Sequence, residues 1–256
     1  LKSTYINYRI FIVDNNSTDN SINNILNWRK DINIVDSCNL QYKDKFKSNI
    51  IVVRHSHNNG FASGNNIVIR FLINQKEEEF IWLLNPDVII EEEVMKHNIT
   101  LCNIGAKSIV GNLIVRYDNR KFFCFGGFHI NKFRHGVKEV LKETDLHKLD
   151  VIHGSSLFTT ISTFKELGLL PEKYFMYWEE TEFCTIAKKR EYRFMVNSKS
   201  IILNHCGSSS NSDFLREYLY LLNGLRFYLK FYPTHFTIIL MSTILKLVKA
   251  LLSNNR

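Results

Sequence analysis

The stretch Arg9-Ile-Phe-Ile-Val-Asp14-Asn-Asn-Ser-Thr-Asp-Asn-Ser21 joins a short apolar run to a polar turn. Residues 9–13 are rich in β-branched and aromatic side chains, which is typical of a buried strand. Asp14 follows where this strand ends, and open α/β sheets bind ligands at the carboxyl ends of their strands. A carboxylate there can accept a hydrogen bond from a pyrimidine N–H or a ribose hydroxyl. We interpret Asp19 or Ser21 as the cap of the next helix.

Strand-like and helix-like runs alternate along the first hundred or so residues. Further buried strands are predicted at residues 49–53 and 80–84, and helices at residues 62–74 and 91–101. This alternation indicates crossover connections between parallel strands. Later strand-like pieces lie at residues 108–115, 121–125, 151–160 and 193–203. We therefore predict an α/β fold with a mixed, mostly parallel sheet flanked by helices.

The end of the chain has a different pattern. Aromatic and leucine residues recur at helical spacing over residues 213–232, and the apolar stretch 236–252 carries only Lys246 and Lys249. That stretch is shorter than the roughly 20 apolar residues that a bilayer span needs. It fits a helix lying on a membrane surface with its lysines toward anionic headgroups. A helix docked on the domain's own core, or on a partner subunit, fits equally well.

Composition narrows the classes of function. The 256 residues are 45% hydrophobic, enough for one domain of residues 1–232 followed by a C-terminal apolar and basic helix of residues 233–256. The five cysteines form no C-x-x-C pair, so we expect reduced thiols and a cytoplasmic protein. The net charge of +8 suits several anionic partners, but no nucleic-acid-binding motif is present and we expect no nucleic acid. Because Leu1 is not a methionine, we expect the chain to begin inside a longer protein.

Two further polar segments follow predicted strands. Asn58-Asn-Gly-Phe-Ala-Ser-Gly-Asn-Asn66 combines two glycines, which permit close backbone approach, with amides able to bond sugar, base or backbone groups. Trp82-Leu-Leu-Asn-Pro-Asp-Val88 ends a strand with one carboxylate. A hard divalent cation takes only one or two protein carboxylates when diphosphate oxygens complete its shell. Taken alone, each segment is as well explained by an ordinary glycine loop or turn.

The segment Tyr174-Phe-Met-Tyr-Trp-Glu-Glu-Thr-Glu-Phe-Cys184 places adjacent carboxylates after an aromatic cluster. Acidic residues followed by an apolar stripe and the basic run 188–190 predict a helix with the carboxylates at its N-terminus. One carboxylate there can act as a base, although an isolated Glu-Glu pair is ordinarily only a complement to the helix dipole. His153-Gly-Ser-Ser156 precedes this segment and Asn204-His-Cys-Gly207 follows it.

The order of these segments is more specific than any one of them. Strand-D-N-N-S-T-D-N-S, N-x-G-F-A-x-G-N-N, L-N-P-D-V, G-S-S, F-x-Y-W-E-E-x-E-F-C and N-H-x-G occur in this order between residue 9 and about residue 232. In this order the chain resembles the family 2 glycosyltransferases of GT-A fold. The bacterial rhamnosyltransferase-like branch, which builds surface polysaccharide, is similar in these motifs.

The resemblance implies an inverting glycosyltransferase that moves a sugar from a UDP- or dTDP-sugar, such as dTDP-rhamnose, to a saccharide or lipid-linked saccharide. Glu180 would be the catalytic base, and Asp87 and His205 would bind Mg²⁺ or Mn²⁺. The residues implied in nucleotide-sugar binding are Asp14, Asn16, Asn59, Gly60, Phe61, Gly64, Asn65 and Asn85. The residues implied at the acceptor wall are Gly154, Ser155, Trp178 and Glu179.

Three departures from the family pattern leave an alternative open. Glu179-Glu180 stands where the family generally has Glu-Asp, and Asn85 stands where many relatives have the first Asp of a D-x-D motif. Nothing before Tyr8 matches the family's opening strand, so the predicted domain lacks it. The alternative is a catalytically impaired or truncated sugar-nucleotide-binding subunit of a polysaccharide assembly complex. In either case the expected location is the cytoplasm or the inner face of the cytoplasmic membrane.

Overall fold

The computed structural model describes residues 3–41, 46–75, 79–105, 107–204 and 213–253. The predicted ligand His205 lies outside these ranges. The first half contains β1 (Ile10–Asp14), α1 (Ser21–Trp28), β2 (Asn33–Asp36), β3 (Ile50–Arg54), α2 (Phe61–Ile73), β4 (Phe80–Leu84), β5 (Val88–Ile90) and α3 (Val94–Asn103). The second half contains β6 (Ser108–Arg116), β7 (Phe122–Phe125), β8 (Gly127–Ile130), β9 (Val137–Glu139), β10 (Val151–Ile152), β11 (Ser156–Thr160), α4 (Ile161–Leu167), α5 (Glu179–Lys189), β12 (Arg193–Asn204), α6 (Asp213–Phe231) and α7 (Phe236–Ser253).

A small parallel sheet carries the first predicted site residue. Its strand order is β1-β3-β2, and Asp14 is in register with Arg54. Ile51, Val52 and Val53 are completely buried, as the apolar run at residues 49–53 predicts. Both strand pairs of this sheet are parallel, which confirms crossover connections among β1, β2 and β3. The predicted helix α2 instead leads to β4, which belongs to the larger sheet.

The larger sheet has the order β4-β11-β6-β12-β5, with β7 paired to β6. Among its described strands, only β6 and β12 run parallel to each other. A third sheet has the order β10-β8-β9, and both of its strand pairs are antiparallel. The mixed α/β prediction is confirmed, but the expectation of mostly parallel pairing is wrong for the described strands. The reason is that short turns, such as the one between β6 and β7, can join only antiparallel neighbours. The strand expected at residues 151–160 is two strands separated by a turn at His153 to Ser155.

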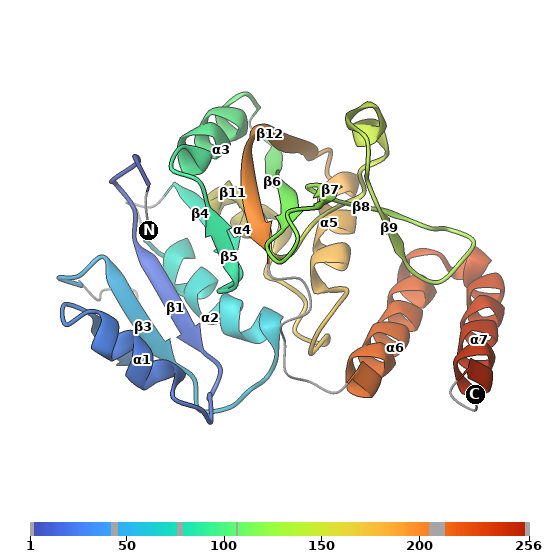
Figure 1. The fold of residues 1–256 in the computed structure, drawn as a ribbon, viewed down its shortest axis with the longest axis horizontal. Helices are drawn as coiled ribbons and strands as arrows, with labels where there is room; N and C mark the ends of the chain where they lie inside the picture. The colour runs from blue at the N-terminus through green and yellow to red at the C-terminus, as the bar shows by residue number, and fades with distance from the viewer. Residues whose placement is uncertain (1–2, 42–45, 76–78, 106, 205–212, 254–256) are drawn as a thin grey trace.

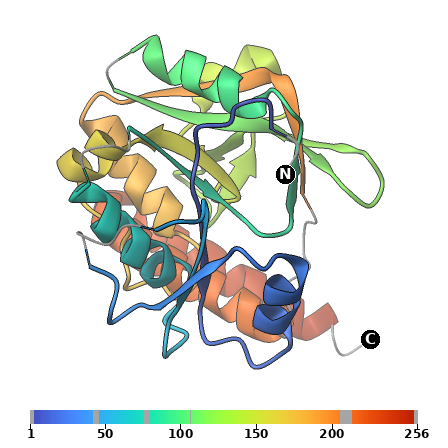
Figure 2. The same ribbon diagram turned by 90° about the vertical axis from the view of Figure 1, so that its left-hand side faces the viewer.

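Helices cover the two ends of the molecule. Figures 1 and 2 place α3 at one end, against β6 and β12, and α6 at the opposite end. In Figure 1, α6 and α7 lie side by side, far from β1 and α1. This arrangement puts α6 next to the loop that leads into α5.

The helix α7 docks on the domain through one face. Ile239 is completely buried, the Ser242 Oγ accepts a hydrogen bond from the His135 backbone N–H at 3.0 Å, and the Lys246 Nζ donates to the His135 carbonyl oxygen. Lys246 therefore points toward the domain, whereas the interpretation of a helix on a membrane surface expected it to point toward the lipid headgroups. None of the described helices is both long enough and apolar enough to cross a bilayer.

Candidate active site

The loop before α5 holds two consecutive residues in an uncommon backbone conformation. Tyr177 has φ 68° and Trp178 has φ 78°, and α5 begins directly afterwards at Glu179. Positive φ is unfavourable for side chains other than glycine, and it persists where surrounding contacts determine it. The predicted N-terminal position of the carboxylates on a helix is confirmed.

The third acid of this segment, Glu182, is a structural residue. It is 3% exposed and accepts hydrogen bonds from the Tyr174 hydroxyl at 2.6 Å and the Lys230 Nζ at 2.8 Å. Lys173 makes a second ion pair with it, at 2.7 Å. Burial alone would raise the pKa of Glu182, but these three partners together hold it below its ordinary value. Glu182 is therefore ionised and fixed.

Glu179 and Glu180 have no such partners. The Oε2 atom of each is buried and accepts no hydrogen bond from the described residues. Burial raises the pKa of Glu180 to about 7, against the opposing effect of its own and Thr181's backbone N–H groups. Burial and then the charge of Glu180 raise the pKa of Glu179. A carboxylate that titrates near neutral pH is well suited to remove a proton, and Glu180 is the more exposed of the two.

The turn between β10 and β11 faces Glu180. A Cβ on Gly154 would stand 3.5 Å from the Glu180 Cδ and 3.7 Å from its Oε1, so the two residues are neighbours. The next residue, Ser155, accepts a hydrogen bond from the Asn85 backbone N–H at 3.1 Å through its carbonyl oxygen. The register of β4 with β11 aligns Leu84 with Ser156 and fixes this contact. The structure thus connects the base candidate to the Asn85-Pro86-Asp87 turn.

A second set of contacts joins the glycine loop (residues 58–66) to the loop that leads into α5 (residues 172–178), which we call the acidic loop. Gly60 has φ 90°, and a Cβ there would stand 2.0 Å from the Phe175 carbonyl oxygen, so no other residue fits without movement. That carbonyl also accepts a hydrogen bond from the Phe61 N–H at 3.2 Å. On the other side of the loop, the Asn15 Nδ2 donates to the Gly60 carbonyl oxygen at 3.4 Å, and a Cβ on Gly64 would overlap the Asn15 side chain.

The first-strand residues lie at the edge of the small sheet. The Asp14 Oδ1 accepts a hydrogen bond from the Ser17 N–H at 3.1 Å, and Asn16 has φ 61° in the same turn. Asn59 is exposed, whereas the Asn65 Nδ2 donates to the Phe61 carbonyl oxygen at 2.9 Å within α2. These contacts therefore bring all four predicted segments together, and Asn65 stabilises its own helix.

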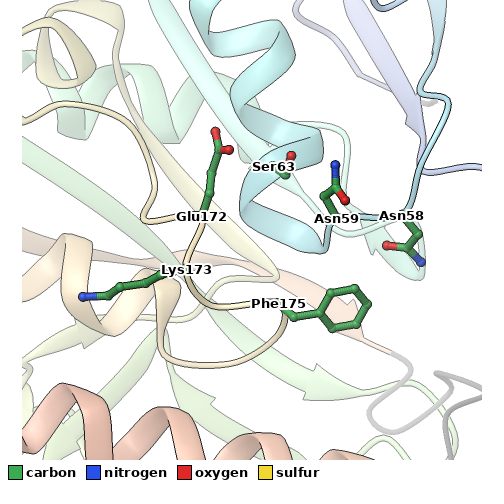
Figure 3. A pocket seen from close by; sticks show the side chains of 6 residues that line it. All are labelled: Asn58, Asn59, Ser63, Glu172, Lys173 and Phe175. Carbon is green, nitrogen blue, oxygen red and sulfur yellow. The ribbon is translucent and has the colours of Figure 1, made fainter.

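A cavity of about 400 Å³ opens between the glycine loop and the acidic loop. It is lined by Asn58, Asn59, Ser63, Glu172, Lys173 and Phe175. Figure 3 shows the Phe175 ring below the two asparagine side chains, while the Lys173 side chain points away from them. Amides beside an aromatic ring are a combination able to bind the hydroxyl groups and the apolar face of a sugar.

The residues fit a cation only if it is shared with a ligand. Among the residues described, no three His, Cys, Asp or Glu side chains come together as a metal site. Asp87 is half-buried after β4, where it can contribute one carboxylate. A magnesium-like ion with one protein carboxylate needs further oxygens, and a diphosphate supplies them. The donor set therefore fits Mg²⁺ or Mn²⁺ bound together with a diphosphate.

Two predicted positions differ from what the sequence indicates. Trp178, expected at the acceptor wall, is 2% exposed, and its indole is turned toward α6. Glu179, expected at the same wall, is 5% exposed. His153 is also structural, since its Nδ1 accepts from the Ser155 N–H at 3.0 Å and burial lowers its pKa to about 4. Asn15 and Phe175 were not among the predicted site residues. The Asn15 side chain contacts Gly60 and Gly64, and Phe175 contacts Gly60 through its carbonyl oxygen, and neither contact has a sequence motif.

Comparison with known proteins bears directly on this arrangement. The family model for "Glycosyl transferase family 2" matches residues 1–159. The chain belongs to glycosyl transferase family 2. The matched residues include the small sheet, the glycine loop, the Asp87 turn and Gly154. The sequence-based identification of the family is thereby confirmed, whereas the comparisons do not resolve its rhamnosyltransferase-like branch.

A curated relative and several solved structures share this similarity. The low-salt glycan biosynthesis hexosyltransferase Agl10 of Haloferax volcanii is 33% identical over 143 residues, which are 52% of this chain and 44% of Agl10. The chain thus spans less than half the length of that relative. The mannosyltransferase PcManGT from Pyrobaculum calidifontis, in complex with GDP-Man and Mn²⁺, has a TM-score of 0.58 at 12% identity, covering 87% of this chain and 55% of PcManGT.

S. aureus TarS, residues 1–349 in complex with UDP-GlcNAc, has a TM-score of 0.53 at 14% identity, covering 89% of this chain and 60% of that one. At such identities the likeness shows the fold alone. The predicted GT-A fold of mixed α/β type is confirmed.

Proposed function

We propose that this chain transfers a sugar from a nucleoside diphosphate-sugar to a hydroxyl group of an acceptor, with inversion at the anomeric carbon. The observation that carries the proposal is the position of Glu180, a half-buried carboxyl at a helix N-terminus beside Gly154, with a pKa raised to about 7. Family membership supports the reaction class.

The proposed reaction is a single displacement. Glu180 removes the proton of the acceptor hydroxyl, the oxygen forms a bond to the anomeric carbon, and the bond from that carbon to the diphosphate oxygen breaks. The nucleoside diphosphate leaves with the bonding electron pair. Asp87, together with His205 as the resemblance implies, would hold a divalent cation, which would supply positive charge to the diphosphate. Asp14 binds the nucleobase or ribose at the edge of the small sheet.

The remaining contacts of the donor are assigned to the glycine loop and its neighbours. The Asn15 side chain contacts Gly60 and Gly64, which supports a donor-binding role for the loop that carries Asn59, Gly60, Phe61 and Gly64. The residues proposed to complete the site are Asn16, Asn65, Asn85, Gly154 and Ser155. The cavity below Asn58 and Asn59 has the size and lining for a saccharide unit.

The proposed donors are UDP- and dTDP-sugars, dTDP-rhamnose among them, and the proposed acceptor is a saccharide or a lipid-linked saccharide used for surface polysaccharide. Agl10 is described as a hexosyltransferase of glycan biosynthesis, and TarS and PcManGT were solved with UDP-GlcNAc and GDP-Man. These names support a nucleotide-sugar donor. A screen therefore begins with UDP-Glc, UDP-GlcNAc, dTDP-rhamnose and GDP-Man.

We also propose that the protein works at the inner surface of the cytoplasmic membrane. The outward face of α7 exposes the apolar residues Ile238, Leu240, Met241, Ile244, Leu245, Leu247 and Val248. Beside it, the exposed Phe133 is flanked by Lys132 and Arg134 and packs on His235 at 5.4 Å. Apolar residues bordered by cations support binding to anionic lipid.

Sedimentation with vesicles tests this membrane contact. Wild type should sediment with vesicles that contain phosphatidylserine and much less with neutral phosphatidylcholine. The double variant Met241→Asp with Leu245→Asp should remain in the supernatant while its melting temperature is unchanged, because both side chains are exposed. Equal sedimentation of wild type and variant would exclude this face.

Release of nucleoside diphosphate tests the transferase proposal. Each of the four donors is incubated with wild-type protein, a saccharide acceptor and either Mn²⁺ or Mg²⁺. The variants Glu180→Gln and Asp87→Asn are then measured in the same assay. We expect turnover to fall by about 10³-fold in Glu180→Gln. Glu166→Gln is the matched control, because Glu166 is an exposed acid paired with Lys107 at 2.6 Å. Full turnover in Glu180→Gln would remove the proposed base, and UDP binding without turnover in wild type would favour the non-catalytic subunit.

A further inference from the structure

The helix α6 presents one face to the loop that leads into α5. Tyr220, Asn223, Gly224 and Phe227 recur at intervals of three and four residues, so they lie on one side of the helix. We call these four residues the α6 cradle. None of them belongs to the segment that the family model matches, which ends at residue 159.

The cradle holds the residue before the two positive-φ positions. The Asn223 Nδ2 donates a hydrogen bond to the Met176 carbonyl oxygen at 2.9 Å, and Asn223 is only 1% exposed. Its Oδ1 accepts from the Arg226 Nη1 at 3.2 Å, which fixes the orientation of the amide. A buried amide that donates to a loop carbonyl determines where that loop carbonyl lies.

The cradle also holds the indole of Trp178. The Trp178 Nε1 donates to the Tyr220 carbonyl oxygen at 2.8 Å, and its ring packs on Phe227 at 5.1 Å. A Cβ on Gly224 would stand 2.7 Å from the Trp178 Cζ2 and 2.1 Å from the His135 Nε2. Only a residue without a side chain at position 224 lets the indole and His135 approach the helix this closely.

These contacts determine a strained segment directly before the proposed base. Tyr177 and Trp178 at φ 68° and 78° lie between the Met176 carbonyl and Glu179. Such a conformation costs free energy and relaxes when its supporting contacts are removed. Relaxation at Trp178 would rotate the first turn of α5, and with it the Glu180 carboxyl that faces Gly154.

We propose that Asn223 and the rest of the α6 cradle position Glu180 by holding Met176 and Trp178 in the conformation that starts α5. Asn223 touches neither the glycine loop nor Gly154 in the described contacts, so it is a positioning residue. The inference rests on the proposed role of Glu180 for its effect on turnover. Its structural part, the placement of the carboxyl, can be measured separately.

The test compares Asn223→Ala with Asn103→Ala, an exposed asparagine at the end of α3. The Glu180 carboxyl is followed by ¹³C NMR titration and assigned by its absence in Glu180→Gln. In Asn223→Ala we expect the midpoint to move by about one pH unit toward an ordinary glutamate, because the released loop admits water. Turnover of the best donor in the screen should fall between about 10-fold and 100-fold. Asn103→Ala should match wild type in both measurements.

Trp178→Phe provides a second variant if Asn223→Ala does not fold, since it keeps an aromatic ring in the cradle and removes the Nε1 donor together with part of the indole. It should shift the same carboxyl in the same direction. A wild-type titration midpoint in a folded Asn223→Ala, or in Trp178→Phe, overturns the inference. If wild type turns over no donor, the transferase proposal fails, and the NMR result still decides whether the α6 cradle positions Glu180.

Discussion

Glu180 and Glu182 stand two residues apart at the start of α5, yet only Glu182 is held by charged partners. Glu182 accepts from Lys230 and Tyr174 and pairs with Lys173, whereas the Glu180 Oε2 is buried without a hydrogen bond from the described residues. Environments that separate the pKa values of neighbouring acids also separate their roles. Five predictions rest on this difference and on the contacts around it.

Turnover should depend on pH through Glu180. The base works only when it is deprotonated, and burial raises the pKa of Glu180 to about 7. We expect kcat to fall about tenfold for each pH unit below 7 and to level off above it. The measurement is nucleoside diphosphate release between pH 5 and 9 at saturating donor. A profile that stays flat down to pH 5 would contradict a base of raised pKa.

The variant Glu180→Gln should be more stable than wild type at alkaline pH. Because the folded-state pKa of Glu180 is raised, its protonated form stabilises the fold fully below the ordinary value of 4.5, and this contribution is lost as pH rises through about 7. With about 1.4 kcal/mol per pKa unit, reduced for partial exposure, the gain at pH 8 is roughly 2 kcal/mol. Urea unfolding at pH 5 and pH 8 measures it. A gain of equal size at both pH values would assign it to another cause.

Glu182→Gln should behave in the opposite way. Hydrogen bonds from lysines and Tyr174 keep the pKa of Glu182 below its ordinary value, so its contribution is present at neutral pH and is lost as pH falls below that value. Removing the charge leaves two lysines without their partner and should destabilise the fold by about 1–3 kcal/mol at pH 7. Urea unfolding at pH 7 and pH 4 checks this. Equal stability of variant and wild type at pH 7 would show that the ion pairs contribute nothing.

Gly60→Ala should separate the glycine loop from the acidic loop. A Cβ at φ 90° and 2.0 Å from the Phe175 carbonyl oxygen cannot be accommodated, and we expect a loss of about 2–4 kcal/mol together with most of the turnover. Gly105→Ala is the matched control, because a Cβ there meets nothing within 4 Å. Thermal melting and donor turnover are compared for both variants. Similar melting temperatures for the two would mean that the close approach does not stabilise the fold.

Gly154→Ala should alter the base without unfolding the protein. A methyl group there would make ordinary contact with the Glu180 Cδ at 3.5 Å, so the melting temperature should stay within a few degrees of wild type. The methyl group excludes water from the carboxyl and should move the acid limb of the kcat profile to higher pH. An unchanged limb would place the Glu180 carboxyl away from position 154 during turnover.

The local sequence pattern was sufficient to predict β4 and the start of α5, which both contribute to the site. Residues 80–84 coincide with β4, and the helix after Trp178 begins at Glu179 as the acidic first turn indicates. The parallel pairing was overestimated because periodicity distinguishes a strand from a helix but not the direction of its neighbour. The direction depends on turns such as the one between β6 and β7.

The predicted segments contact one another in the structure, but the sequence did not indicate the direction in which each side chain points. The sequence predicts Trp178 at the wall of the site. In the structure it points inward, against the face of α6 that carries Gly224. Asn15 and Phe175 were not predicted, because each contributes through a contact with Gly60 from a distant segment, Asn15 by its side chain and Phe175 by its carbonyl oxygen. Contacts between segments far apart in the sequence leave no periodic signal in either segment.

The hydrogen bonds from α7 to His135 have a consequence for a chain that ends after Tyr232. Such a chain lacks Ser242 and Lys246, which bond the His135 backbone in the β8–β9 hairpin, and the loss would expose the His135 imidazole that packs against Trp178. A shortened chain would then have a misplaced Glu180 carboxyl, although the deletion removes no residue near Glu180. Its low turnover would be mistaken for evidence that the wrong donor had been tested.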